Sequence, residues 1–267
     1  MGSGKWRMGN ASHFTFFPTR HSPFATPDFG FAMTMTKTTN ALTLDVQKDG
    51  LRAINQRLQN VPKGSNETHW TIANPAGEHA LAVGLQSPIR VEIMGTAGYY
   101  CAGMNKEATV IVHGNVSTGV AENMMSGYVR VKGNASQSAG ATAHGGLLVI
   151  EGDAAARCGI SMKGVDIVVG GNVGHMSAFM AQAGALVVLG DAGDALGDSL
   201  YEAKLFVRGT VKSLGADCIE KEMRPEHLEL LTQLLAKAEM TADPNSFRRY
   251  GSARKLYNFN IDNADAY

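Results

Sequence analysis

The sequence has few cysteines, and these are poorly placed for chemistry. Only Cys101, Cys158 and Cys218 occur among 267 residues, and no two of them form a CxxC pair. A sparse and odd cysteine count argues against a disulfide framework and fits a reducing compartment. We therefore expect a cytoplasmic protein without disulfides.

Long apolar runs and an excess of one charge are also missing. No run approaches the roughly 20 apolar residues of a membrane-spanning helix. The 24 basic and 24 acidic residues cancel. The sequence gives no electrostatic reason to expect nucleic acid or a membrane surface as a partner.

Proline is absent between residues 91 and 220, although the chain contains eight prolines. Because proline cannot donate a hydrogen bond to a β-ladder, its absence suits continuous strand pairing. Glycine is abundant in the same stretch, and seven glycines recur there at intervals of nineteen residues: Gly95, Gly114, Gly133, Gly152, Gly171, Gly190 and Gly209. A fixed period of this length is typical of a solenoid.

Each repeat has the same local pattern. The residues four and two before each glycine are apolar, as Val110 and Val112 are before Gly114, and Asn, Asp or Thr follows the glycine. The alternation directs two side chains per coil into a stacked interior. We expect each glycine to form a corner at angles unfavourable for a Cβ, and the following Asn or Asp to bond its own backbone. The prediction is an all-β fold, a right-handed parallel β-helix of about seven coils.

The period divides the chain into four parts. These are a disordered extension (1–40), an N-terminal cap (41–90), the β-helix (91–220) and a C-terminal cap helix with a docking tail (221–267). A transit peptide is the alternative for the first part. In the N-terminal cap we expect strands from Leu42, from His69 to Ala73 and from Ala80 to Leu85, and a helix between Gly50 and Val61.

The C-terminal part begins with a helix signal. Pro225 stands at a helix start and is followed by a leucine stripe, which predicts a helix capping the last coil. The basic and aromatic tail after it is interpreted as a docking segment rather than as part of the core. Its candidate docking residues are Arg248, Arg249, Tyr250 and Arg254.

One face of the coils has an unusual apolar stripe. The residue between the two core positions is apolar in several coils: Ile111, Val149, Val168, Val187 and Phe206. In a strand, this residue points away from the interior. The stripe predicts that this face is covered, either by the chain's own terminal segments or by another molecule.

Histidines and cysteines fall into positions that do not converge. His113, His144 and His175 occupy three different places in the nineteen-residue coil, so we do not expect a shared metal. Cys101 and Cys158 share a place but lie three coils apart. That separation is about 14 Å, too far for a disulfide. All three cysteines are expected to be packing residues.

Two further motifs have structural explanations. The stretch DIVVGGNVGHM from Asp166 to Met176 resembles a phosphate loop, but the next repeat strand, not a helix, follows it. Asp191, Asp194 and Asp198 cluster in one coil, whereas a polysaccharide-cleaving β-helix needs acids on one face of neighbouring coils. We expect no catalytic, cofactor-binding or metal-binding residue in this chain.

The coils resemble a known family. VIVHGNVSTGVAENMMSG, VRVKGNASQSAGATAHGG and LVVLGDAGDALGDSLYEA are similar to the GXGXG domain, the C-terminal β-helix of the glutamate synthase large subunit. The similarity extends from about Leu42 to Tyr267, and the tail SFRRYGSARKLYNF resembles the end of stand-alone versions. The resemblance implies a separate subunit of a split, glutamate-synthase-like enzyme, with N-methylglutamate synthase as the best-fitting example.

The resemblance also implies partners and a reaction. One partner is amidotransferase-like, and another binds FMN and an iron–sulfur cluster. The β-helix joins them without catalytic residues of its own, in a hetero-oligomer that forms N-methylglutamate and ammonia from glutamate and methylamine. The C subunit of formylmethanofuran dehydrogenase, or of the related formyltransferase/hydrolase complex, shares the fold and is the alternative. A β-helix enzyme acting on polysaccharides is a disfavoured third possibility.

Overall fold

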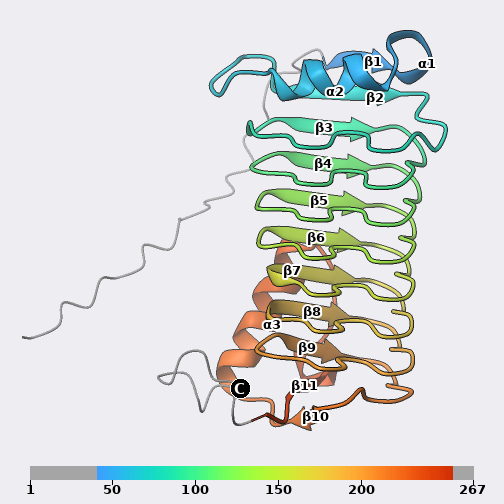
Figure 1. The fold of residues 1–267 in the computed structure, drawn as a ribbon. Coiled ribbons are helices and arrows are strands. Elements are labelled where there is room, and N and C mark those ends of the chain that lie inside the picture. Colours follow the sequence, from blue (N-terminus) through green and yellow to red (C-terminus); the bar gives the residue numbers. More distant parts are fainter. Residues whose placement is uncertain (1–40, 255–267) are drawn as a thin grey trace, which may run out of the picture. The chain divides into compact units, whose positions relative to one another are not determined.

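The predicted coils form a ladder of parallel strands (Figure 1). The computed structural model describes residues 41–254, so the expectation for residues 1–40 lies outside the described residues. One sheet has the strand order β1-β2-β3-β4-β5-β6-β7-β8-β9-β11-β10. Its first nine strands are β1 (Leu42–Asp45), β2 (His69–Ala73), β3 (Arg90–Ile93), β4 (Thr109–Val112), β5 (Tyr128–Val131), β6 (Leu147–Ile150), β7 (Lys163–Val169), β8 (Ala183–Val188) and β9 (Lys204–Val207). The remaining elements are α1 (Val46–Asp49), α2 (Leu51–Gln59), β10 (Cys218–Lys221), α3 (Pro225–Lys237), a 3-10 helix (Pro244–Ser246) and β11 (Arg248–Ser252).

The strand register reproduces the sequence period. Val91 pairs with Val110, and Val110 pairs with Val129, as the nineteen-residue spacing requires. These side chains are fully buried and form one column of a continuous aliphatic core. The parallel β-helix predicted from the repeat is confirmed.

The part of each coil after the corner differs from the expected second strand. It makes a single β-bridge, such as Ala97 to Val116, and then a run of turns in which alternate residues have positive φ, as Tyr100 (58°) and Met104 (54°) do. Successive runs still exchange backbone hydrogen bonds, for example from Tyr100 N to Thr118 O. The prediction of a strand from Ala80 to Leu85 is also wrong, because this stretch forms the run of turns in the first coil.

The repeated glycines are required for close packing rather than for unusual φ angles. Of the seven, Gly95 alone has a φ in the positive range (142°). At Gly114, an added Cβ would lie 2.7 Å from the carbonyl carbon of Gly95, one coil earlier. The backbones stack this closely because Gly133 N donates to Gly114 O at 3.1 Å, and later coils repeat the bond. The expectation of strained corner angles is therefore wrong for the later six glycines.

The Asn and Asp residues after these glycines form a side-chain ladder. The Oδ1 of Asn134 accepts from Asp153 N at 2.8 Å, and the Oδ1 of Asp153 accepts from Asn172 N at 2.6 Å. The same bond links Asn115 to Asn134 and Asn172 to Asp191. The expected bond of each side chain to its own backbone is thus wrong: each side chain stabilises the next coil.

The N-terminal end of the solenoid is closed by β1 and α2. Strand β1 pairs in parallel with β2, and α2 buries Ile54 and Leu58 in the main core. Asn55 fixes the helix to the first coil, because its Nδ2 donates to Ala80 O and its Oδ1 accepts from Ala82 N.

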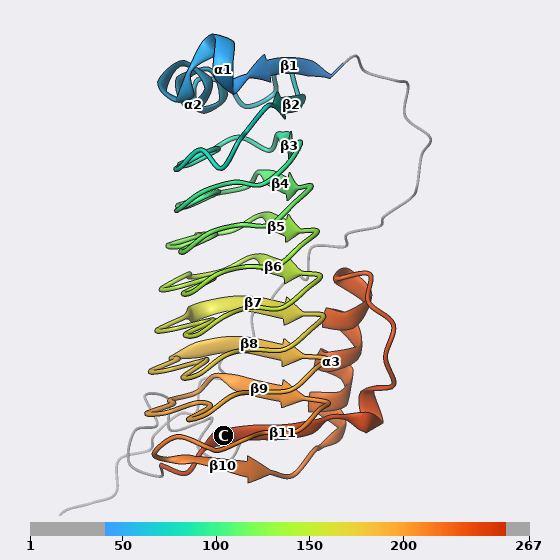
Figure 2. The same ribbon diagram turned by 90° about the vertical axis from the view of Figure 1, so that its right-hand side faces the viewer.

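Helix α3 is present where the sequence predicts it, but it covers the side of the solenoid rather than its end (Figure 2). Leu231, Leu234 and Leu235 pack with the apolar stripe in a second core, which contains Val149, Val168, Val187 and Phe206. The stripe is therefore covered by the chain's own C-terminal segment. Ile111, in strand β4 two strands away from Val149, is 7% exposed and does not belong to this second core.

The last strand corrects the interpretation of the tail. β11 pairs antiparallel with both β9 and β10, so residues 248–252 are part of the sheet. Arg249 and Tyr250 are 5% and 2% exposed. The composition of the tail was misleading. β11 has basic and aromatic side chains although it is paired within the sheet, and the same composition is typical of a docking segment.

Candidate interaction surfaces

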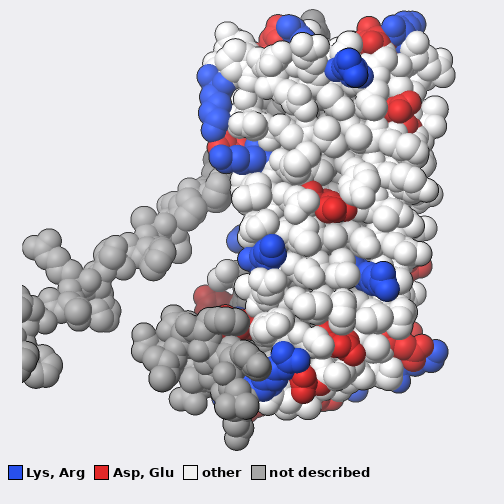
Figure 3. Space-filling model, viewed as in Figure 1, with Lys and Arg blue, Asp and Glu red and all other residues white. Residues whose placement is uncertain are grey.

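The solenoid has two broad outer surfaces. The sheet face is formed by the outward side chains of β2–β9, and α3 covers its C-terminal half. The turn face is formed by stacked turn segments joined by backbone bonds between coils, from residues 80–85 through 99–104, 118–123, 137–142, 156–161 and 175–180 to residues 194–199. Figure 3 looks onto the turn face and shows few charged side chains across it.

Large apolar side chains stand out on the turn face. Tyr99, Tyr100 and Met104 are 48%, 50% and 56% exposed, and Met180 is 39% exposed. The ring of Tyr99 stacks on that of His79 in the preceding coil, with centroids 4.4 Å apart. Aromatic residues and methionine are enriched where proteins contact one another. The turn face is thus an uncovered surface of the described residues with an apolar character.

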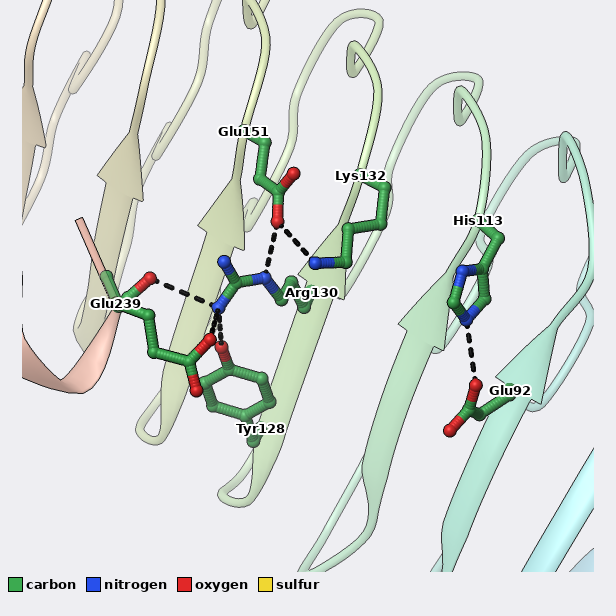
Figure 4. A network of polar contacts seen from close by, with 8 residues as sticks. Glu92, His113, Tyr128, Arg130, Lys132, Glu151 and Glu239 are labelled. Atoms are coloured by element: carbon green, nitrogen blue, oxygen red, sulfur yellow. Dashed lines mark hydrogen bonds and ion pairs between the residues drawn. The ribbon is translucent and has the colours of Figure 1, made fainter.

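The N-terminal half of the sheet face has a polar cluster around Glu92. His113 Nε2 lies 2.8 Å from one of its carboxylate oxygens (Figure 4). His69 Nε2 lies 3.4 Å from the other, and Arg90 Nε donates to the carboxylate at 2.8 Å. Burial raises the pKa of Glu92, but the bonds from Arg90 and His113 outweigh it and hold that pKa below its usual value. The carboxylate is therefore a fixed anion between two imidazoles.

A second network joins the sheet to the end of α3. Arg130 Nε donates to Glu151 at 2.7 Å, and its Nη1 donates to Ala238 O and Glu239 Oε2, both at 3.1 Å (Figure 4). Lys132 Nζ reaches the same oxygen of Glu151 at 2.7 Å. A cation bonded to the last carbonyls of a helix also interacts favourably with its dipole. This network holds α3 against β5.

The three cysteines are buried and free. Burial raises the pKa of Cys101 and Cys158 to about 12, and burial with the nearby Asp198 does the same for Cys218. Since the thiolate is the reactive form, these thiols are poor nucleophiles and poor metal ligands. They pack in the main core, as expected.

The candidate histidines are not brought together. His113 bonds Glu92 on the sheet face, whereas the backbone oxygen of His175 accepts from Arg157 N in the turn face. No group of metal-binding residues occurs within residues 41–254. Sequence analysis missed the approach of His69 to Glu92, because His69 precedes the nineteen-residue register.

The clustered aspartates contact residues of the next coil. Asp191 Oδ1 accepts from Thr210 N, and Asp194 pairs with Lys212 at 2.8 Å; these contacts lower the pKa of both carboxyls. A general acid for glycoside hydrolysis needs the opposite shift. The glycines after Asp166 form the corner of their coil. The chain then continues through turns into β8, and no helix lies between β7 and β8.

The candidate docking residues differ in how they are placed. Arg249 Nη1 donates to Glu222 O and Tyr250 is buried in the core, so these two side chains support the chain's own fold. Arg248 Nη2 donates to Gly209 O, and Arg254 pairs with Asp217. Arg248 is exposed at the start of β11, the strand between β9 and β10.

No helix within residues 41–254 is both long and apolar enough to cross a bilayer. The stacked coils, the Asn/Asp ladder and the helix laid along the side define a parallel β-solenoid protein. No protein-family model matches the chain.

The chain is 68% identical over 225 residues to Protein GlxC of Rhizobium meliloti (strain 1021), an alignment that spans 84% of this chain and 99% of that protein. The chain therefore belongs to the GlxC family. Because the alignment spans nearly all of GlxC, that relative has almost no sequence outside the matched region.

Proposed function

We propose that this chain is a structural subunit of a multi-subunit, glutamate-synthase-like enzyme. The observation that carries the proposal is the coil itself: an apolar strand, a glycine and an Asn or Asp every nineteen residues. The pattern is similar to the GXGXG β-helix of glutamate synthase. The ladder of Gly114, Gly133 and Asn134 explains in physical terms why the pattern repeats.

The chemistry of the described residues supports a joining role. The thiols are buried with raised pKa values, and the clustered aspartates are engaged in turns. The uncovered surfaces offer area and shape instead: a sheet face with Glu92 and its histidines, and an apolar turn face. A stiff solenoid with two such faces can hold two partner chains at a fixed distance.

The finer proposal concerns partners and reaction. One partner is an amidotransferase-like chain, and the other is a synthase chain with FMN and an iron–sulfur cluster. Together they form N-methylglutamate from glutamate and methylamine and release ammonia. In this assignment the cofactors and the reacting groups belong to the partners, in the cytoplasm.

The composition of the native complex tests the proposal. A tag on this chain is used to purify it from its host, and mass spectrometry identifies the chains that co-elute in fixed ratio. We expect an amidotransferase-like chain and a flavoprotein with cluster-binding cysteines. Recovery with a formyltransferase and an amidohydrolase-like chain would instead assign the chain to a formyltransferase/hydrolase complex, and recovery of the chain alone would refute a structural subunit.

A further inference from the structure

Basic side chains gather where the start of α3 meets the last strands of the sheet. The register of β11 places Arg249 between Phe206 of β9 and Lys221 of β10, on the face that α3 covers. Lys204 is two residues before Phe206 and points to the same face. Because the end of α3 bonds to β5, its start lies beside these last strands (Figure 2). His227, in the first turn of α3 and 2% exposed, completes this basic cluster.

Arg249 is the buried centre of the basic cluster. Its side chain is 5% exposed, and its Nη1 donates to Glu222 O at 3.0 Å. Its Nε is buried and has no hydrogen-bond partner within residues 41–254. A buried donor of a charged group is costly to leave unpaired. The guanidinium therefore has bonding capacity that the described fold does not use.

The two lysines of the cluster also lack an acidic partner. Neither Lys204 nor Lys221 forms a hydrogen bond or ion pair through its Nζ in the part of the chain that the structure describes, whereas Lys212 on the turn face pairs with an aspartate at 2.8 Å. Burial lowers the pKa of Lys221, and the neighbouring cations of Arg249 and Arg224 lower it further. The cluster is thus a set of like charges that repel one another.

The nearby acids do not neutralise the cluster. Glu222 and Glu226 are exposed and approach only Arg224, at 3.7 and 4.0 Å. Asp166 accepts a backbone N–H of β8. Asp166 and Glu202 raise the pKa of the lysine in β9, but burial and the neighbouring guanidinium outweigh them and keep it lowered. An anion from outside the described residues would offset this excess of positive charge.

We propose that the basic cluster binds a dianionic oxyanion, either a phosphate group or a dicarboxylate, between the start of α3 and strands β9, β10 and β11. Guanidinium and ammonium groups are the usual protein partners of such anions. The N-terminal end of α3 adds the favourable end of a helix dipole.

The cluster can admit an anion because part of its cover is movable. Lys204 and Lys221 are only half-buried. Gly251 follows Arg249 on the same face of β11. The three atoms nearest to a Cβ added at Gly251 all belong to the stem of Lys221, at 3.3–4.0 Å. This flexible side chain can shift and turn its ammonium group toward the anion. The inference is independent of the proposed function.

Binding of two small dianions to the isolated full chain tests the proposal. Isothermal titration is done with inorganic phosphate and, separately, with succinate, at an ionic strength held constant with chloride. We expect a single site per chain and a rise of about 3–5 °C in the unfolding midpoint at about ten times the Kd. Tighter binding of phosphate assigns the site to a phosphate group, and tighter binding of succinate assigns it to a dicarboxylate. A chain that binds neither overturns the proposal.

Two lysine variants locate the site. Lys204→Met and Lys221→Met keep the apolar stem and remove one cation each; Arg249 is left in place because it also supports β11 through Glu222 O. Each variant should weaken anion binding about tenfold or more. Because each also relieves repulsion, its unfolding midpoint in chloride should be no lower than that of the native chain.

Lys48→Met is the matched control for these variants. It makes the same charge change in the N-terminal cap, where the side chain is 81% exposed, and should bind the anion as the native chain does. Equal loss of binding in Lys48→Met would show attraction to overall charge rather than a site. Lysine variants that unfold at lower temperature in chloride yet keep the native anion affinity would show that the cluster is purely structural, which overturns the proposal.

Discussion

The guanidinium of Arg130 donates to the carbonyl oxygen of Ala238 at 3.1 Å, across 108 positions of sequence. Arg130 is in β5 and Ala238 is the C-cap of α3. This contact fixes the end of the helix that covers the apolar stripe. Because α3 lies along this side of the solenoid, branched aliphatic side chains that would otherwise be exposed there are buried in a second core.

Replacement of Arg130 should loosen α3. Arg130→Met keeps the apolar stem but removes the bonds to Ala238, Glu151 and Glu239, at an expected cost of about 1.5–3 kcal/mol for charged hydrogen bonds. Hydrogen exchange should become faster in the last turns of α3, while α2 stays protected. Lys132→Met is the control: its side chain is 40% exposed, so we expect a loss below about 1 kcal/mol. Equal effects of the two variants would contradict the role assigned to Arg130.

The Asn/Asp ladder predicts a difference between two substitutions at Asp153. Asp153→Asn keeps an Oδ1 to accept from Asn172 N, whereas Asp153→Ala removes the acceptor. We expect the alanine variant to lose about 1 kcal/mol of stability and the asparagine variant to stay close to the native value. Thermal unfolding measures both. If both lose the same stability, the ladder bond is not what the side chain contributes.

The packing role of the repeated glycines can be separated from backbone freedom. At Gly152, φ is outside the positive range, yet an added Cβ would meet Asn134 Oδ1 and lie 3.0 Å from Gly133 O. Gly152→Ala should therefore cost about 1–3 kcal/mol through overpacking.

Gly251→Ala is the matched control for this substitution. At Gly251 the nearest atom to an added Cβ is Lys221 Cδ, at 3.3 Å, in a side chain able to move. Chemical unfolding should show little or no loss at Gly251. A tolerated alanine at Gly152 would refute the close stacking of coils as the reason for the period.

The ion pairs of Glu151 predict an acid-dependent loss of stability. Burial raises its pKa, but the bonds from Lys132 and Arg130 more than offset this and bring it below the usual 4.5. A carboxyl with a lowered folded pKa stabilises the fold above its unfolded pKa, and this contribution is lost as pH falls through the folded pKa. Glu151→Gln should thus cost about 1 kcal/mol or less at neutral pH.

The pH dependence of that variant checks the sign. The difference between native and Glu151→Gln stability should shrink as the pH falls below about 4.5. Glu229→Gln, which removes an exposed carboxylate of α3, controls for general charge effects. A difference that grows on acidification would show that the network raises the pKa of Glu151 rather than lowering it.

The sequence predicted the solenoid because the period acts in every coil: Val110, Val129 and their equivalents must face inward for strands to stack in register. It did not predict what holds successive corners together. The bond from Asp153 N to Asn134 Oδ1 joins residues nineteen apart, and local turn preferences of Asn suggest a bond to its own backbone instead.

The surfaces were less predictable than the fold. The apolar stripe at Val168 and Phe206 correctly indicated a covered face. Whether the cover came from the chain itself depended on where α3 lies, which no local pattern encodes. The burial of Arg249 follows from the antiparallel pairing of β11 with β9, a long-range contact that makes a basic segment part of the sheet.

The joining role proposed for this chain can be tested by native mass spectrometry of the two proposed partner chains, co-expressed with and without this chain. We expect a complex of the amidotransferase-like and flavin-binding chains only when this chain is present. A stable complex of the two partners without this chain would refute the joining role.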